Sequence, residues 1–263
     1  MRSRLYPFAA LFLLLLSSPG VLAAGARIAI VIDDLGNLHA EGLRTLELPG
    51  PVSFAILPFT PHSRTIARIA HNLGRDVLVH MPMQSQSNKA LGPGGLHIEM
   101  DRYEFTQQVR TALRAVPHAR GLSNHMGSLL TEQPRAMTWL MQTLKQEPQL
   151  FFFDSRTTKL TQAALIAEAN NLPNTSRDVF LDNVLDEAAI EKQFDLLIAK
   201  ARLNGSAVAI GHPAPQTLEV LERRIPKLKS QGIRLVSLST LIELRQRPGA
   251  TAPAQVMVYN TTR

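Results

Sequence analysis

Short runs rich in apolar residues recur along this chain, and five of them end on an acid or a histidine. The runs and the polar residues that end them are 27–32 with Asp33 and Asp34, 77–79 with His80, 121–124 with His125, 150–153 with Asp154, and 207–211 with His212. Runs rich in β-branched and aromatic residues are typical of strands that are buried on both faces of a parallel sheet. Because the C-terminal ends of such strands gather on one face of an α/β fold, we expect these acids and histidines to converge on one site for metal or acid/base chemistry.

Segments with helical spacing alternate with the strand-like runs. The expected strands cover 27–32, 52–57, 77–80, 121–125, 150–154, 178–181, 207–212 and 233–236, and the expected helices cover 38–48, 63–73, 101–115, 134–146, 161–170, 186–205, 217–229 and a short last segment. Asp101 and Glu104 have the spacing of a capping box, and Asp186 and Gly205 are expected to begin and end a long helix. About eight strand–helix units without a break in composition predict a single (β/α) barrel. A doubly wound open sheet is the alternative, because the sequence alone does not show closure.

The two ends of the chain differ in composition from the part between them. Arg2 and Arg4 precede an apolar stretch over 8–16, and small residues up to Ala23 follow, which predicts a secretory signal peptide at 1–23. An uncleaved N-terminal anchor is the alternative, although the apolar stretch is shorter than the roughly 20 residues of a membrane span. We therefore expect an exported, periplasmic or secreted protein with no stable membrane span in its mature form. The barrel is expected over 24–246, with a flexible tail over 247–263 that is rich in Pro, Ala, Thr and Asn.

The chain has no cysteine. This excludes disulfides, thiolate ligands and a cysteine nucleophile, so any metal must be held by nitrogen and oxygen atoms. The formal net charge is +7, of which Arg2 and Arg4 lie in the expected signal peptide. No cluster of Lys and Arg interleaved with aromatic residues is present in the sequence, so nucleic acid is not an expected partner.

Adjacent aspartates at a strand end suit a metal-dependent hydrolase, because Asp33 and Asp34 point in different directions. One carboxylate can hold a metal ion while the other faces the water that is to be activated. Other interpretations stay open from the residues alone. An aspartate of the pair could cap the following helix, each histidine could be a hydrogen-bonded structural residue or a strand cap, and Asp154 could cap its loop or pair with Arg156.

Six motifs in this chain resemble those of the divergent polysaccharide deacetylases, the YibQ-type branch of the NodB-like carbohydrate deacetylase superfamily. They are Ile32-Asp33-Asp34-Leu35-Gly36, Val52-Ser53-Phe54-Ala55-Ile56-Leu57-Pro58, His80-Met81-Pro82-Met83, Asn124-His125-Met126-Gly127-Ser128, Phe153-Asp154-Ser155 and Gly211-His212-Pro213. The resemblance implies a distorted (β/α) barrel of the NodB type. It also implies metal-dependent removal of N-acetyl groups from cell-envelope or structural polysaccharides.

The resemblance assigns roles to single residues. It makes Asp33 the general base, Asp34 and His80 metal ligands, and His212 the general acid. The superfamily places a second histidine four residues after the first, where this chain has Gln84, and we predict that His125 supplies the missing imidazole. The arginine that orients the base has no counterpart beside His125. Arg156, two residues after Asp154, is expected to replace it, and Asp154 is kept as a catalytic candidate.

These inferences predict an exported hydrolase that uses a divalent metal, with zinc expected from the Asp/His set, on an N-acetylated polysaccharide or a peptidoglycan-type glycan. Because Gln84 departs from the superfamily pattern, the alternative is a deacetylase-like barrel that binds glycan or a protein partner without catalysis. A glycosidase with paired carboxylates is a third interpretation, but it would leave the histidines without a role. The sequence identifies neither the sugar nor the oligomeric state.

Overall fold

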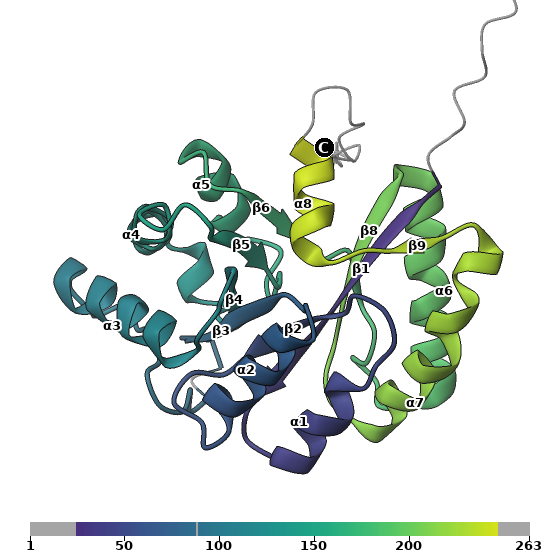
Figure 1. Ribbon diagram of the computed structural model, residues 1–263. Coiled ribbons are helices and arrows are strands. Elements are labelled where there is room, and N and C mark those ends of the chain that lie inside the picture. The colour runs from purple at the N-terminus through teal and green to yellow at the C-terminus, as the bar shows by residue number, and fades with distance from the viewer. Residues whose placement is uncertain (1–24, 88, 247–263) are drawn as a thin grey trace, which may run out of the picture.

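The computed structural model describes residues 25–87 and 89–246 (Figure 1). The expected signal peptide and the expected tail lie outside the described residues. The strands are β1 Arg27–Leu35, β2 Ser53–Ile56, β3 Val77–Met83, β4 Gly121–Met126, β5 Phe151–Asp154, β6 Asn174–Ser176, β7 Val179–Phe180, β8 Ser206–Gly211 and β9 Arg234–Leu235. The α-helices are α1 His39–Leu46, α2 Ser63–Asn72, α3 Arg102–Ala115, α4 Pro134–Leu144, α5 Ala163–Ala169, α6 Glu187–Asn204, α7 Pro215–Arg224 and α8 Leu238–Gln246.

The strands form one parallel nine-stranded sheet in the order β6-β5-β4-β3-β2-β1-β8-β7, with β9 paired to β1. The sheet curls into a distorted half-barrel with helices around it (Figure 1), which confirms the barrel prediction over the doubly wound alternative. Within the described part of the chain, β6 and β7 do not pair with each other, and only Arg177 and Asp178 separate them in sequence. Arg245 of α8 links the two sides of this seam, because its guanidinium donates to Thr175 Oγ1 and Asp178 Oδ2.

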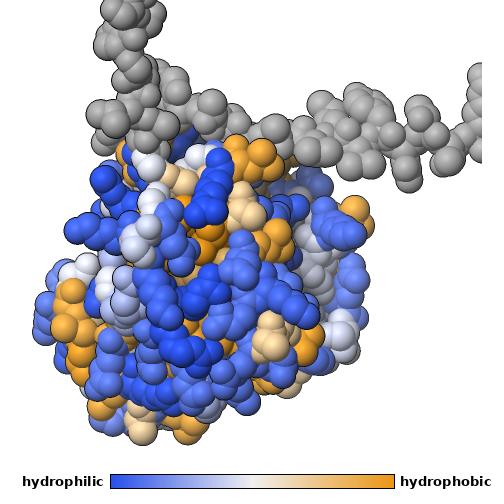
Figure 2. Space-filling view, turned by 90° about the vertical axis from the view of Figure 1, so that its right-hand side faces the viewer, coloured by the Kyte–Doolittle hydropathy of each residue, from blue (hydrophilic) through white to orange (hydrophobic). Residues whose placement is uncertain are grey.

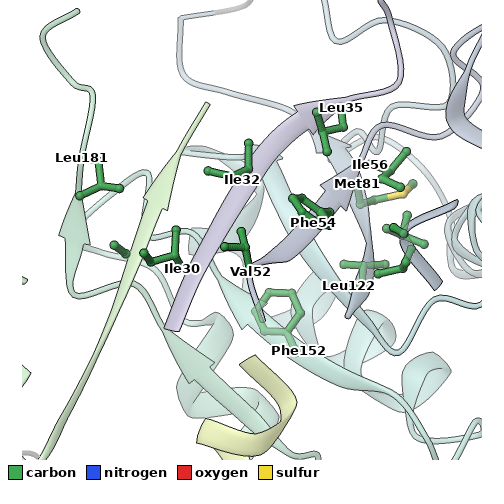
Figure 3. Close-up of a cluster of buried hydrophobic side chains, with 14 of the residues drawn as sticks. Ile30, Ile32, Leu35, Val52, Phe54, Ile56, Met81, Leu122, Phe152 and Leu181 are labelled. Carbon is green, nitrogen blue, oxygen red and sulfur yellow. The ribbon is translucent and has the colours of Figure 1, made fainter. Parts of the chain in front are cut away.

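Alternate residues of each strand enter two separate hydrophobic cores. In β1, Ile28, Ile30 and Ile32 pack in the outer core between the sheet and the surrounding helices, and Figure 3 shows two of them with their neighbours. Ala29 and Val31 face the barrel interior, which α8 fills with Leu238, Leu241 and Ile242. The interior is therefore closed by α8 at the N-terminal end of the strands, which leaves the C-terminal end for the site.

Several elements differ from their predicted extents, and three of these differences have a clear cause. The third strand runs to Met83 instead of ending at His80, because it pairs with β4 along its whole C-terminal half. The strand β6 was missed, since its residues Asn174, Thr175 and Ser176 form no apolar run. The helix expected over 217–229 ends at Arg224, and Pro226 stands in the first of two 3-10 turns that follow.

The predicted helix caps are confirmed. Asp101 and Glu104 form a reciprocal capping box at α3, and the Asp186 carboxylate accepts from the Ala189 N–H at the start of α6. Gly205 ends α6 in the left-handed conformation with φ +76°.

The outer face over α6 and α7 is mostly hydrophilic, with scattered apolar side chains (Figure 2). Ion pairs link the two helices there, since an Arg223 Nη atom lies 3.0 Å from Glu187 Oε2 and 3.1 Å from Glu191 Oε1. Within the described ranges, no helix combines the length and the apolar character that crossing a bilayer requires.

Candidate metal centre and catalytic groups

Strand alternation places four of the predicted residues on the inner face of the barrel. Each of four strands has a series of inward-facing side chains that ends on a polar residue. These series are Ala29, Val31 and Asp33 in β1, Leu78 and His80 in β3, Ser123 and His125 in β4, and Val208, Ile210 and His212 at the end of β8. Side chains two residues apart share a face of a strand. The lower interior is therefore apolar, while its upper rim is lined by one carboxylate and three imidazoles.

A bulge in β1 adds a second carboxylate to this rim. The pairing of β1 with β2 shifts register between Ile32 and Leu35, and Asp34 between them has φ +63°. The extra residue reverses the alternation, so Leu35 enters the outer core although its parity predicts the interior. Left-handed backbone is uncommon outside glycine, and aspartate tolerates it better than most residues. This conformation turns Asp34 towards the histidines.

Asp34, His80 and His125 come together at this rim. Asp34 Oδ1 lies 2.7 Å from His125 Nδ1 and 3.2 Å from His80 Nε2. One ligand atom from each of the three residues lies within 4.8 Å of the other two. The His80 ring is oriented from behind by Ser123 Oγ, which is 2.8 Å from Nδ1, so Nε2 is left to face the site. The role of the three residues as metal ligands stays a prediction, but their geometry is compatible with it.

The donor atoms fit a divalent metal ion. Asp34 Oδ1 is buried, and its short contacts to the two imidazole nitrogens do not have the geometry of hydrogen bonds. A buried carboxylate oxygen without a partner is costly, and an ion between the three residues would satisfy it. Burial by itself raises the pKa of Asp34, but the two histidines hold that pKa well below its usual range. The carboxylate is thus ionised and ready to coordinate.

Asp33 lies beside this group with its carboxylate almost fully buried. Its Oδ2 is 3.5 Å from His80 Nε2, and its Oδ1 has no hydrogen-bond partner. Burial raises the pKa of Asp33 to about 6, although the nearby histidines oppose this shift. A carboxylate with a pKa close to neutral is suited to accept a proton from a bound water.

His212 is held by an aspartate that the sequence reasoning missed. Asp182 is buried, and its carboxylate lies 3.0 Å from His212 Nδ1, 2.6 Å from the His212 backbone nitrogen and 2.8 Å from Thr217 Oγ1. Burial alone lowers the pKa of His212, but the hydrogen bond and charge of Asp182 raise it to about 9. His212 Nε2 points the other way and lies 3.8 Å from Asp34 Oδ2. The signal for Asp182 was present, because the run 178–181 also ends on an acid.

Replacing Asp182 with Asn should lower the pKa of His212 from about 9 towards its ordinary value of about 6.5. Because the pKa of His212 is higher in the folded than in the unfolded protein, protonated His212 stabilises the fold below pH 6.5. This contribution is lost as the pH rises through 9. The wild-type free energy of unfolding should therefore fall across this window, and the D182N variant should show a smaller fall. The ring resonances of His212, followed by NMR against pH in chelator-treated protein, measure the shift directly. An unchanged midpoint would show that Asp182 does not hold the proton on His212.

Asp154 is placed differently from the inward residues. It has the same parity in β5 as Phe152, which packs in the outer core. Its Oδ1 accepts from the Arg156 backbone N–H and its Oδ2 from Thr161 Oγ1, at 2.9 and 3.1 Å. Burial raises its pKa, and these hydrogen bonds oppose the rise. These are the contacts of a loop cap, which was the alternative interpretation of this residue, and no contact among the described residues joins it to Asp34.

The catalytic role expected of Arg156 stays a prediction, and a second arginine, Arg177, is more buried nearby. The Arg156 side chain is exposed, and its guanidinium makes no hydrogen bond within the described structure. Arg177 Nε donates to the Ser155 carbonyl at 2.7 Å, and its guanidinium lies 5.1 Å from the centre of the Phe180 ring. Burial and the charge of Arg156 lower the pKa of Arg177, while Asp154 and Asp33 oppose this. The short polar segment between β6 and β7 that carries Arg177 gave no sequence signal.

Gln84 takes a structural part in place of the superfamily's second histidine. Its Oε1 accepts from the Ile98 N–H at 2.8 Å, and its backbone pairs with Leu96 and with the N–H groups of Leu129 and Leu130. The side chain thus fixes the loop after β3 and does not join the Asp34 group.

Solved structures share this fold. An uncharacterized protein from Agrobacterium tumefaciens C58 superposes with a TM-score of 0.79 at 22% identity, over 85% of this chain and 92% of that one. The catalytic domain of a peptidoglycan N-acetylglucosamine deacetylase from Eubacterium rectale gives a TM-score of 0.51 at 14% identity, over 82% and 90% of the two chains. A CE4 family pseudoenzyme from Bacillus anthracis gives 0.50 at 14% identity, over 83% and 66%. At these identities the likeness concerns the fold alone.

Sequence relatives are closer. The uncharacterized protein YibQ of Escherichia coli is 41% identical over 96% of this chain and 77% of its own length, and an uncharacterized protein of Haemophilus influenzae is 41% identical over 83% and 77%. The profile of the divergent polysaccharide deacetylase family matches residues 30–242, which include every inward residue of the rim. This chain therefore belongs to the divergent polysaccharide deacetylase family.

Proposed function

We propose that this chain is an exported, metal-dependent hydrolase that removes N-acetyl groups from an envelope glycan. The observation that carries the proposal is the grouping of Asp34, His80 and His125 around an unpartnered, buried carboxylate oxygen. A candidate base, Asp33, and a candidate acid, His212, flank this group. Export rests on the signal-peptide pattern at the N-terminus.

Asp34, His80 and His125 would hold the metal ion, for which zinc is our choice given one carboxylate and two imidazoles. When bound, such an ion polarises the acyl carbonyl and lowers the pKa of a coordinated water. Asp33 would accept the proton of the water that attacks the acyl carbon. His212 keeps its proton on Nε2, since Asp182 engages Nδ1, and donates it to the nitrogen of the departing amine. Ser123 fixes the orientation of the His80 ring throughout.

Acetate release tests the proposal. The purified protein, stripped with a chelator and then reloaded with zinc, should release acetate from chitohexaose or from peptidoglycan fragments, and the stripped protein should not. The reason is that Asp33 and His212 alone leave the acyl oxygen without charge stabilisation. Elemental analysis before and after stripping gives the metal content. Equal acetate release in both states would contradict metal dependence.

The alternative function is a barrel that binds glycan or a protein partner without catalysis. Gln84 favours it, because its side chain is committed to the Ile98 N–H and adds no ligand to the Asp34 group. A protein that binds chitohexaose, contains no metal and releases no acetate would support this alternative. The assay described above separates the two functions.

A further inference from the structure

The neighbouring helices α2 and α3 carry positive charge without any acid in between. Residues 59–75 and 105–120 contain no Asp and no Glu. The same two segments contain six arginines, of which Arg64, Arg68, Arg110 and Arg114 are exposed on the helices. Like charges on adjacent helices destabilise one another unless a counter-charge is close. Such an arrangement therefore indicates an anionic partner.

The two helices leave a groove between them. It has a volume of about 660 Å³ and is lined by Arg64 and Arg68 of α2, by Thr111 and Arg114 of α3, and by the loop that contains Phe59. Arg64 Nη1 lies 3.3 Å from the Arg114 carbonyl oxygen, which joins the helices at one point. In the part of the chain that the structure describes, none of these three arginines has an acidic partner within 4 Å. We call this feature the α2–α3 groove.

One end of the α2–α3 groove contacts the loops that follow β1 and β3, the strands that carry Asp34 and His80. Phe59 at this end is 37% exposed and has φ +61°, which is an outlier for a bulky residue. Its ring packs against Gly94 of the loop after β3, where a Cβ atom would be 2.3 Å from Phe59 Cε2. The next residue, Thr60, packs against Gly36, which is two residues beyond Asp34. An aromatic residue with a strained backbone is thus held partly exposed at the end of the α2–α3 groove, against the loop after β3.

At the far end of the groove, the α2 and α3 segments meet again through a pair of histidines. The rings of His71 and His118 are stacked, with centroids 4.0 Å apart and planes 3° from parallel. Both side chains are exposed. The surface from Phe59 to this histidine pair therefore extends along the whole of α2. It carries aromatic and cationic side chains and no acidic residue.

We propose that the α2–α3 groove binds an acidic polysaccharide chain, whose carboxylate or phosphate groups pair with Arg64, Arg68 and Arg114 while a sugar ring packs on Phe59. The guanidinium fork matches the geometry of such groups. The idea that the bound polysaccharide continues into the metal centre rests on the proposed function. The proposal that the groove binds the polysaccharide does not. A concave groove between two helices admits a single polymer chain, whereas a bilayer surface would need a flat or protruding apolar face.

Calorimetric titration of the full chain with hexagalacturonate tests the groove, because binding is measured without any turnover. The R64Q/R68Q double variant should bind roughly fivefold to thirtyfold more weakly than wild type, as expected for two partly screened ion pairs. High salt should weaken the binding of hexagalacturonate to wild type and reduce the difference in affinity between wild type and R64Q/R68Q. F59A should also weaken binding, but with the salt dependence of wild type retained.

The matched control removes two exposed charges on the other side of the molecule. K192Q/K227Q alters α6 and the turn after α7, and neither lysine side chain makes a hydrogen bond or an ion pair in the described structure. It should bind hexagalacturonate as wild type does. Equal weakening in both double variants would show only a general charge effect and would overturn the proposal. Arginine-dependent binding to phosphatidylglycerol vesicles without binding to hexagalacturonate would also overturn it, in favour of a membrane surface. A negative result in the acetate-release assay would not change the interpretation of these binding measurements.

Discussion

Replacing Asp33 with Asn should reduce acetate release by about 10²- to 10⁴-fold, the usual contribution of a general base, while the metal content stays that of wild type. Asn is close in size to Asp but cannot take the proton of the attacking water. Asp33 Oδ1 has no hydrogen-bond partner, so no structural contact of that atom is lost. Acetate release by zinc-loaded D33N, with elemental analysis of the same sample, is the measurement.

The same variant should be more stable than wild type in its metal-free form. The pKa of buried Asp33 is raised to about 6 from an ordinary 3.8, so the folded state loses stability as the pH rises through this window. At neutral pH, an amide at this position avoids the penalty, which is as much as about 3 kcal/mol for such a shift. In zinc-loaded wild type, acetate release should also fall at acid pH, where the base becomes protonated, with a midpoint below 6 because the positive charge of the ion lowers the pKa of Asp33. Wild-type activity in D33N would show that Asp33 is not the base, and a D33N variant less stable than wild type would contradict the raised pKa of Asp33.

The alternation of side chains along strands explains how much of the site could be predicted. His80, His125 and His212 end strand-like runs, and the convergence of strand ends in a parallel sheet was enough to predict that they share one rim. Asp154 ends a similar run, but it has the parity of Phe152 and caps a loop on the outer side. The sequence could not separate these cases, because both faces of each run are apolar and only the fold shows which parity faces inward.

Other features of the site depend on geometry that no local pattern encodes. The turn of Asp34 into the site requires a bulge whose register shift is set by pairing with β2, a contact between distant segments. Arg177 takes its place because it lies in the two-residue connection between β6 and β7 at the open seam of the barrel, and β6, which precedes it, has no apolar run. Closure of the barrel interior by α8 likewise depends on a helix that lies far from its partner strands in sequence.

The loss of the superfamily's second histidine leads to the last prediction, which concerns metal affinity. His80 and His125 lie on the adjacent strands β3 and β4, and both rings approach the same oxygen of Asp34. Their ring centroids are 5.1 Å apart and the planes are inclined by 69°, so two imidazole nitrogens can meet one ion from different directions. If His125 takes the place of the missing ligand, H125A and H80A should weaken zinc binding equally, by roughly a hundredfold or more, since even residues that only orient a ligand contribute 10- to 100-fold.

Competition with a chromophoric chelator measures these affinities, and H97A provides the matched control. His97 is exposed on the loop after β3, and its side chain makes no hydrogen bond in the described ranges, so H97A should keep wild-type affinity. S123A should give a smaller loss than either ligand variant, because Ser123 only orients the His80 ring through Nδ1. Wild-type affinity in H125A would remove His125 from the ligand set. The prediction that His125 replaces the histidine missing at position 84 would then be wrong. The non-catalytic barrel would become the better account of this protein.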